Sequence, residues 1–149
     1  MNKLAKIALL AMIAMGALLT SCSTEEAKIV CGREWNPALQ LVADTTSEFE
    51  LINPMIVQFR YGTGFDFPTL KIAFYEGTAA NKGREIWNYE TKVSEKVSVY
   101  TLQGHSKRGG LMTAAELTRH KAPGSIVIEA TTGSRVLAVK EISLVKNKP

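Results

Sequence analysis

The residue types that most often carry out catalysis or bind metals are few in this 149-residue chain. Its two histidines, His105 and His120, are not followed by a metal ligand two or four residues later. Cys31 has no His or Asn at a spacing typical of a known cysteine nucleophile, and neither a Gly-x-Ser-x-Gly turn nor a Gly-x-x-x-x-Gly-Lys loop occurs. Asp44 and Asp66 lack the further oxygen ligands that calcium requires, and we expect both to be turn residues. The sequence therefore predicts no catalytic residues, no metal site and no cofactor, and it favours a protein that is not an enzyme.

An aromatic loop is the first candidate binding feature. In Tyr61-Gly62-Thr63-Gly64-Phe65-Asp66-Phe67-Pro68, two glycines free the backbone and two rings, Phe65 and Phe67, flank the carboxylate of Asp66. This composition is suited to binding a sugar or a peptide. The alternative is that both rings fold inward, because burying each is worth roughly 1.5–3 kcal/mol. Exposure of Phe65 and Phe67 decides between the two.

Two basic segments form the second candidate. His105-Ser106-Lys107-Arg108 lies in a glycine-rich stretch, and Arg119-His120-Lys121 follows it closely. If the fold brings the segments together, they can meet anionic lipid or lipopolysaccharide head groups, with Lys107 and Arg108 as contact residues. The alternative is a solvated loop. A projecting loop at 104–110 is also what an inhibitor of an envelope-directed hydrolase, such as a lysozyme or protease, would use.

The elements that position these residues are mostly β-strands, because the apolar pattern from Ile29 onward has a period of two. Thr113 and Glu116 fit a capping box at the start of one helical turn over 113–120. The last two strands form a hairpin around 132–134, and a bulge near Lys140 would bring Leu137 and Val139 into phase with the residues after them. The expected strands are 38–43, one within 49–61, 69–76, 86–93, 96–102, 125–131 and 135–145.

About seven short strands with so little helix predict an all-β domain of two packed sheets. The order of a helical turn, Pro123-Gly124 and a closing hairpin resembles the last third of immunoglobulin-like sandwiches in bacterial envelope proteins. This resemblance implies an antiparallel two-sheet sandwich, with a small closed β-barrel as the alternative.

The amino-terminal stretch indicates export. Lys3 and Lys6 precede an unbroken apolar run from Ile7 to Leu19, which is shorter than the roughly 20 residues of a membrane span. The junction Leu19-Thr20-Ser21-Cys22 resembles the lipobox of bacterial lipoproteins. In that family the cysteine thiol receives a diacylglyceryl group, the preceding peptide is removed and the new amino terminus is acylated. The resemblance implies a signal peptide at 1–21, a lipidated tether at 22–28 that starts at Cys22, and a domain at 29–149.

The charge composition of the chain limits the kinds of partner that we expect. The chain has 18 basic and 14 acidic residues; removing Lys3 and Lys6 with the signal leaves 16 against 14. No Lys/Arg-rich stripe with interleaved aromatics occurs, so nucleic acid is not an expected partner. With Cys22 lipidated, Cys31 is expected to be a buried apolar side chain on an early strand, with an intermolecular disulfide as the alternative. Ser23 stands where an aspartate marks inner-membrane retention in enteric bacteria, which favours the outer membrane, on its periplasmic or surface face.

We therefore expect a lipid-anchored protein of the cell envelope whose β-sandwich is a non-catalytic scaffold or protein-binding module. Its partners would be the membrane, through the lipid at Cys22, and an envelope protein. The alternatives are a ligand- or carbohydrate-binding adhesin module that uses loop 61–68, and the hydrolase inhibitor.

Overall fold

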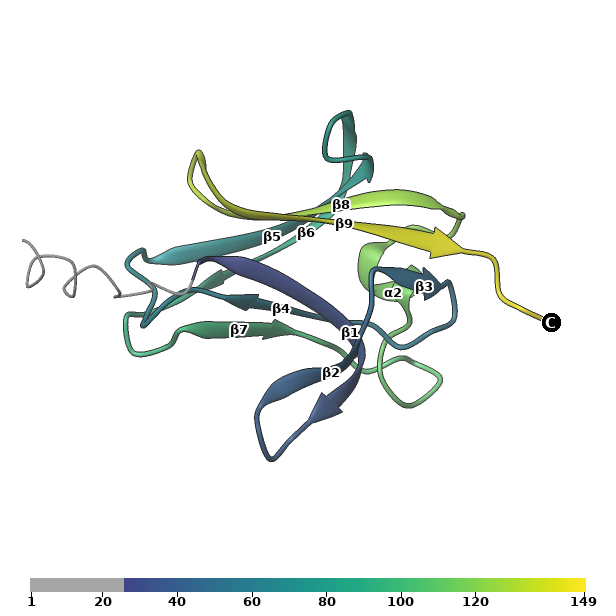
Figure 1. Ribbon diagram of the computed structural model, residues 1–149, viewed down its shortest axis with the longest axis horizontal. Helices are drawn as coiled ribbons and strands as arrows, with labels where there is room; N and C mark the ends of the chain where they lie inside the picture. The colour runs from purple at the N-terminus through teal and green to yellow at the C-terminus, as the bar shows by residue number, and fades with distance from the viewer. Residues whose placement is uncertain (1–25) are drawn as a thin grey trace, which may run out of the picture.

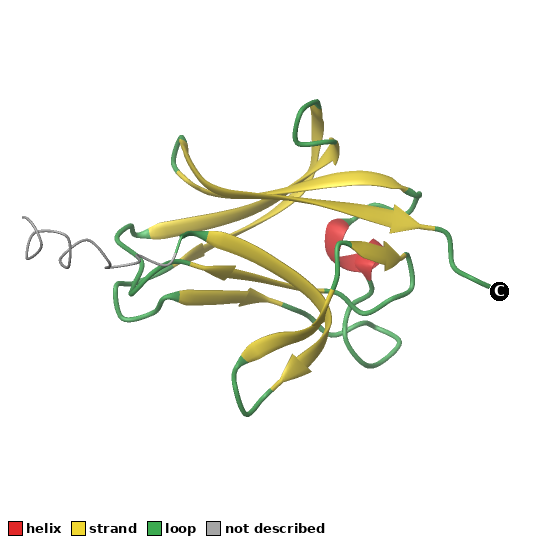
Figure 2. Cartoon of the chain, viewed as in Figure 1, coloured by secondary structure: helices red, strands yellow, loops and turns green. Residues whose placement is uncertain are grey.

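The computed structural model describes residues 26–149, which form two β-sheets packed face to face with a short helix at one end (Figures 1 and 2). The predicted signal peptide, Cys22 and the first tether residues lie outside the described residues. Ala27 already packs against the core, and Lys28 is the first residue of a strand. Within 26–149, none of the helical structure is long and apolar enough to cross a membrane.

The first sheet has the order β2-β1-β4-β7 and the second the order β3-β9-β8-β5-β6. All pairings are antiparallel except that of β3 with β9. The strands are β1 (Lys28–Asn36), β2 (Leu41–Thr45), β3 (Glu48–Glu50), β4 (Ile56–Arg60), β5 (Thr69–Gly77), β6 (Lys82–Lys92), β7 (Val99–Leu102), β8 (Gly124–Thr132) and β9 (Arg135–Val145), and helix α2 spans Ala114–Thr118.

The strand order is that of an immunoglobulin-like sandwich. In that fold, strands A, B and E share one sheet, and strands G, F, C and C′ share the other. Here β1, β4 and β7 take the first set of positions, and β9, β8, β5 and β6 take the second. The two sheets do not close on each other, so the predicted sandwich is confirmed and the barrel alternative is wrong.

Alternating apolar residues fill the space between the sheets. Leu70, Ile72 and Phe74 of β5 face inward opposite Val57 and Phe59 of β4, and all are buried. Strand β4 is buried on its other face as well, because the β1–β2 hairpin bends over it. The buried Gln58 side chain on that face donates to the carbonyl of Gln40 and the hydroxyl of Thr101, each at 3.0 Å. The only long polar side chain in β4's interior stretch is thus satisfied rather than left unpaired.

The strand predictions were wrong near the start of the domain. The expected strand at 38–43 is a turn at 37–40 followed by β2, and β1 precedes both. The stretch 49–61 is interrupted between β3 and β4, with Pro54 just before β4 as a strand-start proline. Strand β6 starts earlier than expected, because shifts in its register with β5 break the alternation, and β7 starts later, after a turn in which Val97 donates to Ser94.

The carboxy-terminal hairpin is confirmed, with its bulge displaced. Ala130 pairs with Ala138 and Thr131 with Val136, so the additional residue is Leu137 and not one near Lys140. Leu137 packs against the core, whereas Val139 is exposed on the outer face. A single bulge therefore brings only one of the two residues to the core.

Candidate functional site

Loop 61–68 closes the end of the sandwich at which β1 begins, which we call the aromatic end (Figure 1). Phe65 is 1% exposed and Phe67 is also buried. The Phe65 ring stacks on that of Phe59 at 5.9 Å between centroids, and Tyr61 meets Phe67 edge-on at 5.1 Å. Both rings are core residues, which answers the exposure question and argues against a ligand site built on them.

Backbone bonds hold this loop against the segment before β7. The amide of Tyr61 donates to Ser98 at 2.8 Å and that of Phe65 to Val97 at 2.9 Å. Asp66 lies between the two rings in sequence, and its side chain is exposed. The loop therefore acts as a fixed plug, with one carboxylate left at the surface.

The two basic segments come together at the opposite end of the sandwich, which we call the helix end (Figure 1). Thr113 caps α2 by accepting from the Glu116 amide, and Glu116 accepts from the Thr113 amide at 2.9 Å, which confirms the capping box. The loop before the helix closes on itself, because Met112 donates to Gly104 and Ser106 donates to Gly110. The Ser106 hydroxyl then donates to Glu116 at 2.9 Å and joins the loop to the helix.

Two adjoining hollows lie around this junction. The first, of about 410 Å³, is lined by Leu51, Ile52, Leu111, Ala115, Arg108 and Lys121 among others. The second, of about 380 Å³, shares Ser106, Ala115, Glu116 and Lys121 with it and is also lined by Lys107 and Arg119. The fold thus places Lys107, Arg108, Arg119 and Lys121 around one carboxylate.

That carboxylate is already engaged. The Thr113 amide and the Ser106 hydroxyl stabilise its charged form and hold the pKa of Glu116 below its usual value. Among residues 26–149, the ion pairs are Arg33–Asp44, Lys71–Glu85, Lys82–Glu129 and Arg84–Glu76, none of which includes a cation of the helix end. Arg119 is held instead over the Trp87 ring, at 5.1 Å from its centroid.

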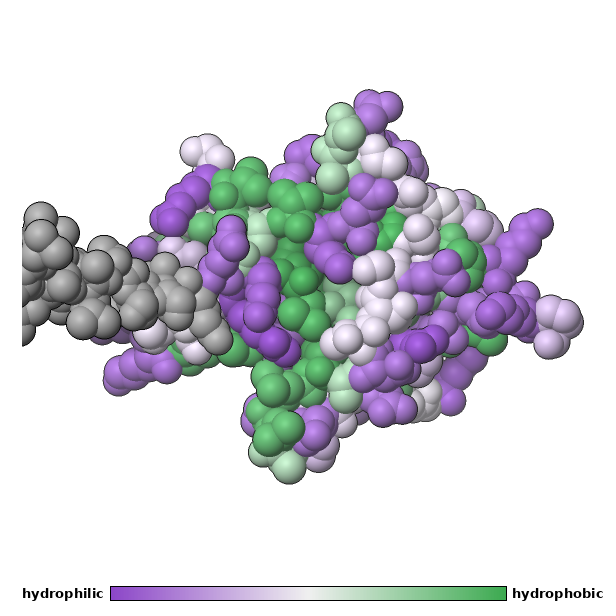
Figure 3. Space-filling model, viewed as in Figure 1, coloured by the Kyte–Doolittle hydropathy of each residue, from purple (hydrophilic) through white to green (hydrophobic). Residues whose placement is uncertain are grey.

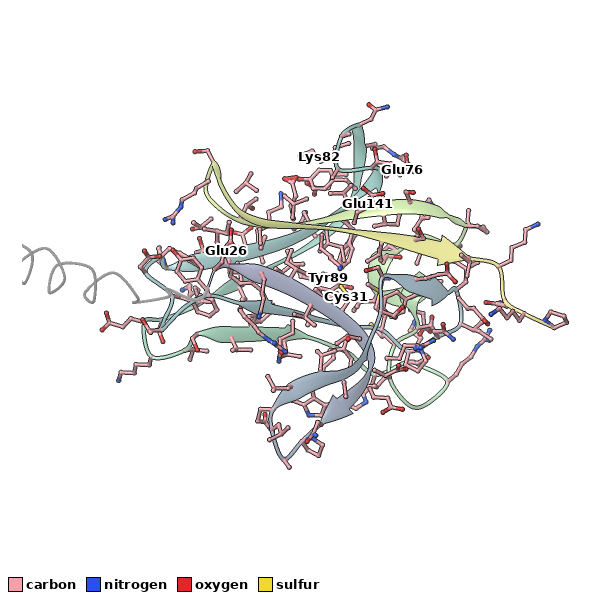
Figure 4. The ribbon with its side chains drawn as sticks, in the orientation of Figure 1. Glu26, Cys31, Glu76, Lys82, Tyr89 and Glu141 are labelled. Carbon is pink, nitrogen blue, oxygen red and sulfur yellow. The ribbon has the colours of Figure 1, made fainter. Side chains whose placement is uncertain are left out.

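Cys31 occupies the core, 2% exposed (Figure 4). Burial raises the pKa of its thiol to about 12, against a smaller opposing effect of Lys140. The side chain is therefore a neutral thiol at physiological pH, as expected of a buried apolar residue. Asp44 lies in β2 rather than in a turn and is paired with Arg33 across the strands at 2.6 Å, so its predicted turn role is wrong.

A charged network on the outer face of the second sheet was not predicted. The tip of the β5–β6 hairpin folds over that face, where Lys82 binds the largely buried Glu129 at 2.6 Å and the Ala79 amide donates to Glu141 (Figure 4). Burial and a bond to Glu85 raise the pKa of Tyr75 to about 12. Glu129 among the apolar residues of β8 was the available signal, since a buried carboxylate requires a partner.

An apolar tip projects from the sandwich at the β1–β2 hairpin. Figure 3 shows hydrophobic side chains gathered on this projection, where Leu39 is 65% exposed. Exposed apolar groups that cluster on a projection are typical of interaction surfaces. The tip was not predicted, because residues 38–43 were expected to form a strand.

No protein-family model matches this chain, and no curated protein sequence matches it. The fold is similar to the crystal structure of an immunoglobulin-like protein from Pseudomonas aeruginosa, with 15% identity and a TM-score of 0.46 over 83% of this chain and 99% of that one. A β-glucosidase from Erythrobacter marinus is similar over 67% of this chain and 14% of its own, with 18% identity and a TM-score of 0.35. The domain is an immunoglobulin-like module by its strand order.

Proposed function

We propose that this chain is a lipoprotein of the bacterial cell envelope whose immunoglobulin-like domain is a non-catalytic protein-binding module. The single observation that carries the proposal is the junction Leu19-Thr20-Ser21-Cys22 at the end of a short apolar run. Lipidation at Cys22 would add several acyl chains, each buried CH₂ contributing about 0.8 kcal/mol, which suffices for stable anchoring without a spanning helix.

The tether in this proposal is short. Because Ala27 already packs on the core, only residues 23–26 separate the lipidated cysteine from the domain. Four residues extend at most about 14 Å. The aromatic end would therefore stand close to the membrane, and Ser23 favours the outer membrane.

The described side chains support a binding role over a catalytic one. Cys31 is buried as a neutral thiol, and Glu129 and Glu85 are engaged by lysines. The exposed Leu39 tip and the cations of the helix end offer surfaces to a partner instead. Binding through such surfaces requires no tuned protonation.

Mass spectrometry of the protein from its native host tests the anchor. We expect an amino terminus at Cys22 that carries the lipid mass, and Cys22→Ser should move the protein out of the membrane fraction. Cys31→Ser is the matched control, because this buried thiol takes no part in anchoring and the variant should keep the lipid. An unmodified Cys22, or an amino terminus at another residue, contradicts the proposal.

A further inference from the structure

The helix end combines an apolar surface with a cationic rim. Leu51, Ile52, Leu111 and Ala115 line the larger hollow, and 59% of the surface of Ile52 is exposed. Arg108 and Lys121 border the same hollow, one from each basic segment. Exposed apolar surface next to an arginine is typical of binding surfaces, in which Arg is enriched.

The positive charge of this rim is only partly offset within the described chain, by the single carboxylate of Glu116. Lys107, Arg108, Arg119 and Lys121 have no carboxylate in an ion pair among residues 26–149. The carboxylate of Glu116 between them accepts from Thr113 with one oxygen and from Ser106 with the other. The rim therefore keeps exposed positive charge that the carboxylates of a partner would complement.

We propose that the larger hollow beside α2 docks an acidic segment of a partner protein that carries an apolar side chain. The apolar side chain would lie against Leu51, Leu111 and Ala115, and the flanking carboxylates would face Arg108 and Lys121. This inference rests on the proposed function as a binding module, and it names the chemistry of the partner.

The place of the hollow favours a protein over a membrane surface. The helix end lies opposite the end at which β1 begins (Figure 1). Strand β1 alone has nine residues, about 30 Å of extended chain, and its first residue follows the short tether. A domain that stands on this tether holds the hollow away from the head groups of its own membrane and towards other envelope proteins.

The docking surface is preorganised. Bonds from Ser106 to Gly110, from Gly109 to Ser106 and from Met112 to Gly104 fix the loop, and Ser106 fixes it to the helix. Little loop entropy is lost when a partner binds to such a surface.

Fluorescence anisotropy with the full chain in phosphatidylcholine nanodiscs tests the inference. The probes are labelled short peptides in which glutamates flank one leucine, phenylalanine or alanine, and co-sedimentation of the same nanodiscs with vesicles containing phosphatidylglycerol tests a lipid partner. We expect the leucine or phenylalanine peptide to bind more tightly than the alanine peptide, with an affinity that falls as salt is added. Reversing both charges in Arg108→Glu/Lys121→Glu should weaken binding by about tenfold or more.

The matched control is Lys92→Glu/Lys96→Glu, which makes the same change in net charge at exposed lysines of the aromatic end. It should leave the peptide affinity within about twofold, because these lysines lie at the end of the sandwich opposite the hollow (Figure 1) and exposed charges separated by more than about 10 Å are largely screened. Equal losses in both double variants, equal binding of all three peptides, binding to vesicles alone, or no peptide binding would overturn the inference. None of these results bears on the lipid mass at Cys22, so a failure here is distinct from a failure of the anchor.

Discussion

The two ends of the sandwich are closed in different ways. At the aromatic end, Phe65 and Phe67 turn inward and fill the space between the sheets. At the helix end, Leu117 of the five-residue helix α2 is buried, and the polar residues around it stay at the surface beside two hollows. Loop 61–68, which is rich in aromatic rings, is part of the core. Loop 104–110, which is bonded to the capping box of α2, lies at the surface. The aromatic end therefore stabilises the fold with its rings, whereas the helix end leaves its charged side chains accessible.

Truncating the aromatic plug should produce the largest effect. Phe65→Ala removes a ring stacked on Phe59 and should lower the free energy of unfolding by about 3–5 kcal/mol, out of a total of about 5–15 kcal/mol. Urea denaturation provides the measurement. Asp66→Ala, at the exposed neighbouring position, is the control and should change stability by less than about 0.5 kcal/mol. Similar values for the two variants would show that the plug is not part of the core.

Substitutions at the helix end should lower the free energy of unfolding by a smaller amount. Thr113→Ala removes the side-chain cap of α2 and should cost about 1 kcal/mol. Thr113→Ser keeps the hydroxyl and should restore most of that loss. Lys107→Ala in the adjacent loop should change the free energy of unfolding by less than about 0.5 kcal/mol. A larger cost for Lys107→Ala than for Thr113→Ala would mean that the basic loop is structural, and the comparison between the ends would fail.

The smallest effect is a pH dependence at Glu116. Its folded pKa is lowered by the Thr113 amide and the Ser106 hydroxyl, so its contribution to stability is present above the unfolded pKa of about 4.3 and is lost as pH falls through the folded pKa. Glu116→Gln should therefore be less stable than the wild type at neutral pH, and the gap should narrow in acid. Denaturation curves of both proteins across this range test it, and a gap independent of pH would contradict it.

The sequence was sufficient to predict those elements whose pattern of residues is regular and depends only on neighbours a few positions away. Leu70, Ile72 and Phe74 mark β5 almost to its observed bounds, and the spacing of Thr113 and Glu116 fixes the start of α2, because each depends on neighbours within a few residues. The bounds of β1 were missed, although Cys31 was expected on an early strand, because Gly32, Arg33 and Glu34 interrupt the apolar pattern.

The candidate site was only half predictable. The basic character of 105–108 and 119–121 is evident in the sequence, but their joint position around Glu116 depends on the closed loop before α2 and on the packing of the helix. Part of the apolar lining of the larger hollow comes from Leu51 and Ile52, about sixty positions earlier in the chain than Leu111. Contacts across such separations are set by the topology of the two sheets, which a periodic pattern does not specify.

The direction of β1 has a mechanical consequence. If the chain is tethered at Cys22 and a partner holds the helix end, tension pulls Lys28 along the axis of its own strand. The pairs from Lys28–Arg60 to Gly32–Ile56 would then bear the load together in shear, because ladder hydrogen bonds run perpendicular to the strands. Peeling β1 away one bond at a time would require a sideways force, so a domain loaded in this direction would resist unfolding.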